Sequence, residues 1–206
     1  MYDYLIYDFD GTLSDTYPIF TEAFLKMMEK YNIPQDYDTV YGLLKQSVGV
    51  AIGNYEFPMS KKEAREEFEA IYQPIAVEKQ NLFSDSEDIL RFGMAQNKKN
   101  YVYTHSGKWV YALFERMGIQ DCFEFVIDST YDFPRKPDPT ALNFMIEKCG
   151  IDRSKALMIG DRDLDIEVAH AAGMDACLID PDNFYPELQT EYRIKTLSEL
   201  KEIISF

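Results

Sequence analysis

Two aspartates stand two positions apart near the start of the chain, in the segment YDFDGTLSD at residues 7–15. They are Asp8 and Asp10, and an apolar run at 5–7 leads directly into the first of them. Carboxylates this close repel each other, so one of them must take up a proton or both must face a cation. Asp and Gly are also ordinary turn residues. The segment by itself therefore predicts either a plain turn after a strand or a metal-dependent site.

A second pair of acids, Asp161 and Asp165, lies four residues apart in the segment IGDRDLDIEVAHAAG. Residues at this spacing share one face at the start of a helix. If the fold brings this pair to Asp8 and Asp10, the four charges disfavour one another's ionisation, and a hard divalent cation resolves the conflict. Mg²⁺ suits such a group because it is usually bound by one or two carboxylates, waters and a substrate phosphate. We therefore expect Mg²⁺ as the cofactor.

Groups of the opposite character follow two further apolar runs. Lys136 lies in the segment PRKPDP, where Pro137 and Pro139 restrict the backbone. Thr104 precedes HSG, which we expect to open a helix, so that the Thr104 hydroxyl and free N–H groups of the helix form an anion pocket. Acids with Mg²⁺, a hydroxyl, a lysine and a helix end are the parts of a phosphoryl-transfer site.

The elements that must position these residues are short apolar runs, each followed by a polar residue or a glycine. The runs lie at 4–7, 101–103, 123–127, 156–159 and 176–179, and the residues that follow them are Asp8, Thr104, Asp128, Gly160 and Asp180. Continuous apolar runs indicate strands that are buried on both faces, as in a parallel sheet. Helical patterns lie between most of them, so we expect an α/β fold with a doubly wound, Rossmann-like parallel sheet. Ligands bind at the carboxyl ends of the strands in such sheets.

Local signals predict where several of these helices begin and end. Ser84 and Glu87 have the spacing of a capping box. Gly118, Gly150 and Gly173 each follow a helical pattern and are expected to end it.

One connection is much longer than a sheet crossover requires. Roughly 90 residues separate Asp10 from the second run, whereas a crossover needs only about a dozen. The inserted segment has helical patterns throughout, including a capping box at Ser60 and Glu63. We expect an α/β catalytic core at 1–15 and 82–206 and an inserted helical cap, acting as a lid, at 16–81.

The inserted segment carries two apolar stripes at helical spacing. The first includes Phe20, Phe24 and Tyr31, and we expect some of these rings to face the site because a small bundle cannot enclose them all. The second lies on the helix that Ser60 and Glu63 are expected to open, which runs through Ala64, Phe68, Ile71 and Ile75.

Composition excludes several classes of partner. The 206 residues include 36 Asp and Glu but only 21 Lys and Arg, for a formal net charge of −15. No basic surplus exists to neutralise phosphates, so we expect no nucleic-acid and no membrane partner, although a small anionic substrate needs only a local positive charge. Three scattered cysteines (Cys122, Cys149 and Cys177) indicate reduced thiols, and we see no signal peptide. We expect a cytoplasmic location.

Four segments in this order resemble the motifs of the haloacid dehalogenase superfamily of phosphatases, and the resemblance covers essentially the whole chain. DFDGTLSDT is similar to the first motif, and Thr104 after an apolar run is similar to the second. Lys136 in RKPDP matches the third, and IGDRDLDIEVAHAAG is close to the fourth. The insertion is similar to the helical cap of the phosphoglycolate phosphatase and β-phosphoglucomutase branch.

The resemblance implies a role for each aspartate. Asp8 is expected to be the nucleophile, forming an aspartyl-phosphate intermediate. Asp10 is expected to protonate the leaving oxygen and then to accept the proton of the attacking water. Asp8, the backbone carbonyl of Asp10 and Asp161 are expected to hold Mg²⁺, and Asp165 is expected to orient Lys136 or a metal-bound water.

The resemblance also implies a phosphate site and a substrate site. Thr104, the N–H of His105 and Lys136 are expected to hold the phosphoryl oxygens. The second motif departs from the usual Thr-Asn-Lys, because His105 and Ser106 follow Thr104. We expect the His105 side chain to start a helix rather than to catalyse. The cap residues expected to read the substrate are Lys45, Gln46 and Ser47.

The sequence thus predicts a Mg²⁺-dependent phosphatase that hydrolyses a small phosphorylated metabolite, acting as a monomer or homodimer. A phosphomutase of the β-phosphoglucomutase type is the alternative, because it shares every core residue. The arginine expected in the cap of a mutase is missing at Gly49, which together with Thr12 favours hydrolysis.

Three further alternatives fit less well. Dehalogenation has no need of Asp10, Asp161 and Mg²⁺ together. A signalling receiver domain lacks the helical insertion and has its phosphoacceptor on a middle strand. A catalytically silent relative is disfavoured because no core residue is missing.

Overall fold

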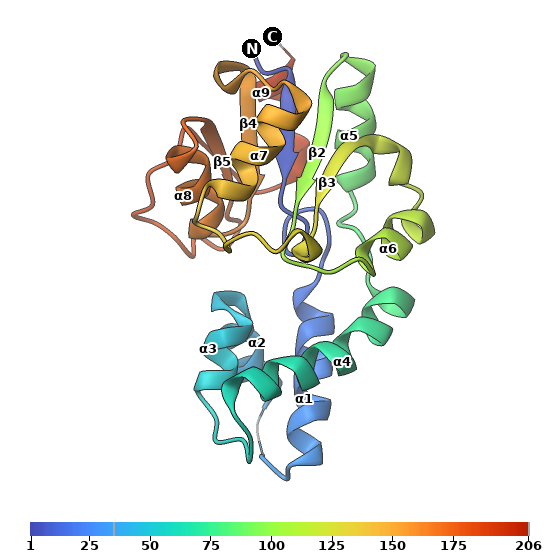
Figure 1. The fold of residues 1–206 in the computed structure, drawn as a ribbon, viewed down its shortest axis with the longest axis vertical. Coiled ribbons are helices and arrows are strands. Elements are labelled where there is room, and N and C mark those ends of the chain that lie inside the picture. Colours follow the sequence, from blue (N-terminus) through green and yellow to red (C-terminus); the bar gives the residue numbers. More distant parts are fainter. Residues whose placement is uncertain (35, 206) are drawn as a thin grey trace. The chain divides into compact units, whose positions relative to one another are not determined.

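The computed structural model of the protein describes residues 1–34 and 36–205, and the chain divides into two compact units. The first, called here the sheet unit, comprises Met1–Ser14 and Leu82–Phe206. The second, called here the helical unit, is Asp15–Asn81. Figure 1 shows the mixed strands and helices of the first and the purely helical second.

The sheet unit is built on six parallel strands in the order β3-β2-β1-β4-β5-β6. They are β1 (Tyr4–Tyr7), β2 (Lys99–Tyr103), β3 (Phe123–Ile127), β4 (Ala156–Gly160), β5 (Asp175–Ile179) and β6 (Tyr192–Ile194). The predicted doubly wound parallel sheet is confirmed, and so are its five predicted strands. Strand β6 was not predicted, because three residues with only one buried side chain make no continuous apolar run.

Strand β1 lies at the centre of the sheet, at the point where the order of the strands reverses. It pairs with β2 on one side, Tyr7 opposite Val102, and with β4 on the other, Tyr7 opposite Ile159. All three side chains of Leu5, Ile6 and Tyr7 are fully buried, which explains the continuous apolar run. The crevice beyond such a reversal point is where open α/β sheets bind ligands.

Helices cover both faces of this sheet (Figure 1). They are α5 (Ser86–Ala95), α6 (Val110–Met117), α7 (Thr140–Cys149), α8 (Asp163–Ala171) and the short α9 (Leu200–Ile204). Helices α7 and α8 share one apolar core with the strands, including Leu142, Met145 and Ile166. Gly118 and Gly150 end α6 and α7 in the left-handed conformation, as predicted.

Two predicted helix starts in this unit are wrong. Helix α5 begins at Ser86 after Asp85, and Ser84 and Glu87 form no capping box there. Ser86 instead donates to the carbonyl of Leu13 (2.7 Å), which ties the helix to the segment after β1. Helix α6 begins at Val110, so the HSG segment is a loop rather than the opening of a helix.

The helical unit packs four helices around its own core. They are α1 (Tyr17–Lys30), α2 (Tyr37–Gln46), α3 (Val48–Gly53) and α4 (Lys61–Lys79). The predicted capping box of Ser60 and Glu63 is confirmed at the start of α4. Helix α4 contains Ala64, Phe68, Ile71 and Ile75, as predicted, and its buried residues are Ala64, Phe68, Tyr72 and Ala76.

The aromatic side chains of the helical unit pack against one another. Phe24 is fully buried, and Phe20 lies against Tyr72 with ring centroids 4.5 Å apart. Tyr31 packs edge-on against Phe57 and donates to Glu67 (2.5 Å). Phe20 and Tyr31 nevertheless stay half-buried, so the bundle does not enclose all three rings, and the expectation that some of them face the site stays a prediction. Among the residues that the structure describes, no helix has both the length and the apolar character needed to cross a membrane.

Candidate active site

Asp8 and Asp10 lie on a tight turn that leaves the central strand. The N–H of Asp8 donates to the carbonyl of Ile159 in β4 (2.8 Å), which fixes Asp8 at the end of both strands. The chain then folds back, and the N–H of Ser14 donates to the carbonyl of Phe9 (3.0 Å). Gly11 within this turn has φ of 87°, a conformation that glycine adopts without steric cost. The apolar run therefore ends in a sharp turn whose geometry requires the glycine.

Lys136, from the segment between β3 and α7, reaches the end of β1 with its side chain. Its Nζ donates to Asp8 Oδ1 and Asp165 Oδ1, both at 2.7 Å, and to the carbonyl oxygen of Tyr103 at 2.9 Å. The Lys136 side chain is 3% exposed and that of Asp165 is also 3% exposed. These contacts are charge-assisted hydrogen bonds away from bulk water, which makes them strong and directional.

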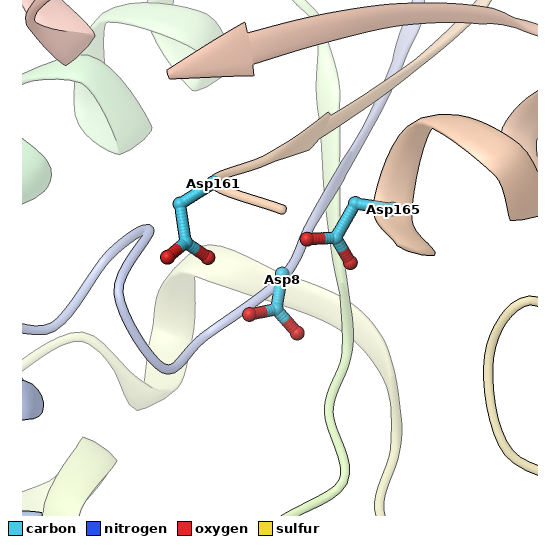
Figure 2. A group of neighbouring side chains, drawn as sticks. All are labelled: Asp8, Asp161 and Asp165. Carbon is cyan, nitrogen blue, oxygen red and sulfur yellow. The ribbon is translucent and has the colours of Figure 1, made fainter. Parts of the chain in front are cut away.

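Three carboxylates gather around this lysine. Asp8, Asp161 and Asp165 each offer an oxygen within 4.8 Å of those of the other two (Figure 2). Asp161 lies in the loop after β4 and Asp165 in the first turn of α8, so the expected shared helix face is wrong although the two do converge. Lys136 balances one of the three charges. Two formal negative charges and hard oxygen donors remain, and this set fits a divalent cation such as Mg²⁺.

Burial and charge act on this cluster in opposite directions. Burial raises the pKa of Asp8 well above its usual range, Lys136 opposes the rise, and Asp165, Asp161 and Asp10 add to it. For Lys136, burial alone would lower the pKa, but the carboxylates of Asp165 and Asp8 outweigh it and raise the pKa. The lysine therefore stays an ammonium, and the crowded acids are the groups that a cation relieves.

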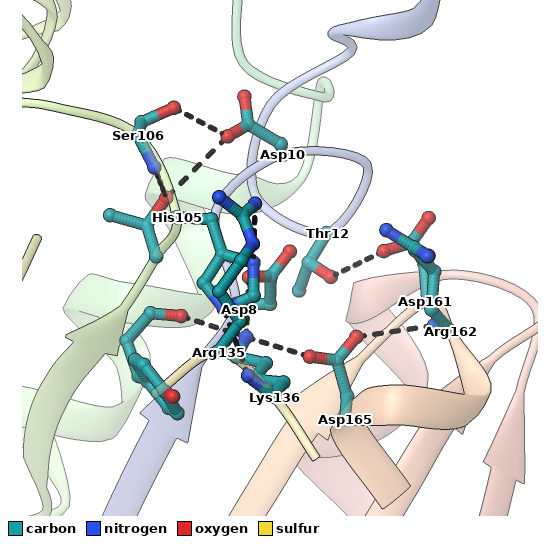
Figure 3. Close-up of polar contacts among 12 residues, drawn as sticks. Asp8, Asp10, Thr12, His105, Ser106, Arg135, Lys136, Asp161, Arg162 and Asp165 are labelled. Carbon is teal, nitrogen blue, oxygen red and sulfur yellow. Dashed lines mark hydrogen bonds and ion pairs between the residues drawn. The ribbon is translucent and has the colours of Figure 1, made fainter. Parts of the chain in front are cut away.

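The side chain of Asp10 turns toward the loop after β2 rather than toward the three carboxylates. Its Oδ2 accepts from Ser106 Oγ at 2.7 Å and from Thr104 Oγ1 at 3.5 Å (Figure 3). Thr104 and Ser106 are both buried. Only the backbone carbonyl of Asp10 was predicted as a metal ligand, and the position of its side chain leaves that prediction open.

His105 lies in the same loop, and its ring contacts the segment of Lys136. Its Nε2 accepts from the Lys136 N–H (3.2 Å), and its Nδ1 lies 2.9 Å from an Arg135 guanidinium nitrogen. A neutral imidazole accepts at one nitrogen only, so the two contacts alternate with the tautomer. Because α6 begins at Val110, His105 does not start a helix as we expected. It instead braces the backbone that carries the lysine.

Not every polar residue at a strand end joins this cluster. Asp128, after β3, accepts from Tyr111 Oη (3.0 Å) and the N–H of Thr130 (2.8 Å). Asp180, after β5, accepts from the N–H of Phe184 and from Arg193. These two aspartates therefore stabilise the loops that follow their own strands and do not take part in the carboxylate cluster.

The predicted substrate residues lie together in the helical unit. Lys45 and Gln46 end α2, and Ser47 caps α3 by accepting from the N–H of Val50 (2.9 Å). A Cβ atom at Gly49 would lie 3.6 Å from Arg65 Nη2. The sequence showed no arginine in this loop, but α4 brings one beside it.

Sequence reasoning missed two polar residues of these clusters, Ser106 and Arg65. Ser106 stands two residues after Thr104, where the departure from the usual motif was the available signal. Arg65 gave no signal, because its approach to Gly49 depends on how α3 packs against α4.

Comparisons with known proteins agree with this geometry. The family model described as haloacid dehalogenase-like hydrolase matches residues 5–179. The phosphoglycolate phosphatase of Nitrosococcus oceani is 29% identical over 216 residues, covering 98% of this chain and 96% of that protein.

Solved structures give the same result. A hydrolase from Streptococcus pneumoniae TIGR4 has a TM-score of 0.68 at 30% identity, covering 100% of this chain and 99% of that one. A haloacid dehalogenase-like family protein from Streptococcus pneumoniae has a TM-score of 0.86 at 16% identity, covering 98% of each chain, and supports the fold alone. With the family model matching most of its length, the chain belongs to the haloacid dehalogenase-like hydrolase family, as its four motifs predicted.

Proposed function

We propose that this chain is a Mg²⁺-dependent phosphatase that hydrolyses a small phosphomonoester through an aspartyl-phosphate on Asp8. The observation that carries the proposal is the environment of Asp8, which is buried, bound to Lys136 Nζ at 2.7 Å and clustered with two further carboxylates. Family membership and relatives named phosphoglycolate phosphatase make the chain a phosphoric monoester hydrolase.

The chemistry divides into two half-reactions. A carboxylate oxygen of Asp8 attacks phosphorus, the bond to the leaving oxygen breaks, and that oxygen keeps the electron pair and takes a proton from the Asp10 carboxyl. A water molecule then attacks the same phosphorus, Asp10 accepts its proton, and inorganic phosphate leaves as Asp8 is restored. Lys136 and Thr104 hold the phosphoryl oxygens during both steps.

A divalent cation fits the acidic side of the same site. Asp8, Asp161 and the carbonyl of Asp10 would hold it, and Asp165 supports the arrangement through Lys136 (2.7 Å). When bound, Mg²⁺ supplies positive charge that stabilises the phosphoryl oxygens in the transition state.

The names of the relatives suggest which substrate to test first. Phosphoglycolate is a small phosphomonoester, and we propose that a substrate of this size and charge is hydrolysed here. We further propose that the helical unit is a cap that selects the substrate through Lys45, Gln46 and Ser47. Replacing Lys45 by alanine should then change the order of preference among substrates. A cytoplasmic location and a monomer or homodimer stay predictions.

The test of this function is phosphate release from 2-phosphoglycolate, sugar phosphates and p-nitrophenyl phosphate, in Mg²⁺ and in EDTA. We expect turnover only in Mg²⁺, and a phosphoryl group on Asp8 when the reaction is quenched in acid and analysed by mass spectrometry. Asp8→Asn should be inactive, because an amide does not attack phosphorus. Full turnover in EDTA, or a phosphoryl group trapped elsewhere, would refute the proposal.

One observation keeps the mutase alternative in view. Arg65 lies beside Gly49, so a cation is present in the loop where the sequence offered none. A mutase would convert a sugar 1-phosphate into its 6-phosphate without releasing phosphate. Product analysis by phosphorus NMR therefore separates the two functions.

A further inference from the structure

Ser106 makes a shorter hydrogen bond to Asp10 than Thr104 does. Its Oγ donates to Asp10 Oδ2 at 2.7 Å, across 96 positions of the sequence. Ser106 is 7% exposed, so this hydrogen bond is largely screened from bulk water. Figure 3 shows the two side chains directed at each other.

The backbone of Ser106 is itself held in place on both sides. Its N–H donates to Thr104 Oγ1 at 3.0 Å, and its carbonyl accepts from the N–H of Ser129 at 2.9 Å. The backbone that carries the serine hydroxyl is therefore fixed, and the carboxyl group of Asp10 that binds this hydroxyl is held in a defined position.

Thr104 offers Asp10 a second hydroxyl, but at a longer distance. Thr104 Oγ1 lies 3.5 Å from the same oxygen of Asp10, the limit of a hydrogen bond. The same Thr104 hydroxyl is needed to bind a phosphoryl oxygen in the proposed reaction. When substrate takes up that hydroxyl, Ser106 is the one that stays with Asp10.

We propose that Ser106 is a positioning residue for Asp10 in acid–base catalysis. By holding Oδ2, it sets the direction of the other carboxyl oxygen, Oδ1, which gives its proton to the leaving oxygen and later accepts the proton of water. A hydroxyl suits both halves of the cycle, because Oδ2 accepts from it whether Asp10 is a carboxylate or is protonated at Oδ1. The inference rests on the proposed function, since it requires Asp10 to be the acid and base.

The test compares the Ser106→Ala variant with the wild type on a series of phosphomonoesters whose leaving groups differ in how much they need protonation. The measured quantity is kcat/KM in Mg²⁺, because it covers the steps up to loss of the leaving group. For 2-phosphoglycolate and glycerol phosphate, whose alkoxide needs a proton, we expect a loss of about 10- to 100-fold. This is smaller than the ~10²–10⁴-fold contribution of acid–base catalysis as a whole, because the Asp10 carboxyl is still present. For p-nitrophenyl phosphate, whose leaving group needs little protonation, the loss should stay below about threefold.

Two variants serve as controls. Ser106→Thr keeps the hydroxyl and should recover most of the activity on alkyl phosphates. Ser129→Ala leaves the backbone hydrogen bond to Ser106 intact and should behave as the wild type. Fluorescence of Trp109 checks folding, and if Ser106→Ala does not fold, Ser106→Cys enters the same comparison because its thiol is a weak donor.

The Asp10→Asn variant separates failure of this inference from failure of the proposed function. If Asp10→Asn loses alkyl phosphates selectively and Ser106→Ala does not, or if Ser106→Ala loses all substrates equally, Ser106 does not position the acid. If Asp10→Asn itself shows no dependence on the leaving group, the proposed role of Asp10 is wrong and the inference falls with it.

Discussion

Replacing Lys136 by methionine removes the ammonium group that is bonded to both Asp8 and Asp165. Each ion pair is 2.7 Å long, which corresponds to about 6 kcal/mol at an effective dielectric constant of about 20. Much of this is offset by the cost of burying the three charges. Methionine keeps the volume and the apolar stem, so the variant isolates the loss of the charge.

The net cost has a ceiling, because a buried carboxylate without a counter-ion takes up a proton instead. At pH 7, protonating an acid whose usual pKa is about 3.9 costs about 4 kcal/mol. We therefore expect Lys136→Met to lower the free energy of unfolding by about 3–4 kcal/mol in EDTA. A carboxyl with a raised pKa binds more protons in the folded state, so its penalty grows as the pH rises. Lowering the pH from 7 should shrink the loss by about 1.4 kcal/mol per unit for each carboxyl protonated.

Urea unfolding, followed by tryptophan fluorescence, measures this loss of stability in the sheet unit. Trp109 is the single tryptophan of the chain and lies in the sheet unit, so it reports the unit that contains the site. Mg²⁺ should recover part of the stability of the variant, because the cation binds only the folded cluster.

Lys98→Met is the matched control for this experiment. Lys98 is also buried, but its ion pair with Asp3 is 3.8 Å long and the Asp3 side chain is 40% exposed. Its removal should cost less than about 1 kcal/mol. A Lys136→Met variant no less stable than this control, at every pH, would refute the electrostatic account of the site.

Two further predictions concern space and hydrogen bonding. In Gly160→Ala, the added methyl would lie 2.3 Å from Asp165 Cβ, so Asp165 must move, and we expect about 1–3 kcal/mol of destabilisation in urea unfolding together with loss of p-nitrophenyl phosphatase activity. An unchanged activity would contradict this prediction, because it would show that Asp165 can move without disturbing the site. In the helical unit, Gln80 accepts from Tyr72 Oη (2.6 Å) and donates to Thr16 Oγ1 (2.9 Å), all three buried or nearly so. Gln80→Ala should cost about 1–3 kcal/mol, seen as faster amide exchange in α1 and α4 but not in the sheet, and equal exchange in both units would contradict it.

Strands β1 and β4 could be read from the sequence because nearly all of their residues are buried. Residues 5–7 and 156–159 are apolar throughout and have no exposed face, so composition alone marks them as strands. Strand β6 has one buried residue of three and could not be found in this way. Helix ends were predicted well where glycine adopts the left-handed conformation. The start of α5 was predicted poorly, because Ser84 and Glu87 form no capping box and Ser86 binds the carbonyl of Leu13.

The sequence by itself determined that Asp8, Thr104 and Asp161 lie at the same edge of the sheet, because parallel strands have their carboxyl ends on one side. It also placed Lys136 near them through its motif. Only the tertiary structure decided which strand-end aspartates serve the cluster, since Asp128 and Asp180 turn to their own loops. The pairing of Asp10 with Ser106 was decided there too, because the rotamers of two side chains 96 positions apart follow from packing, and no local periodicity encodes it.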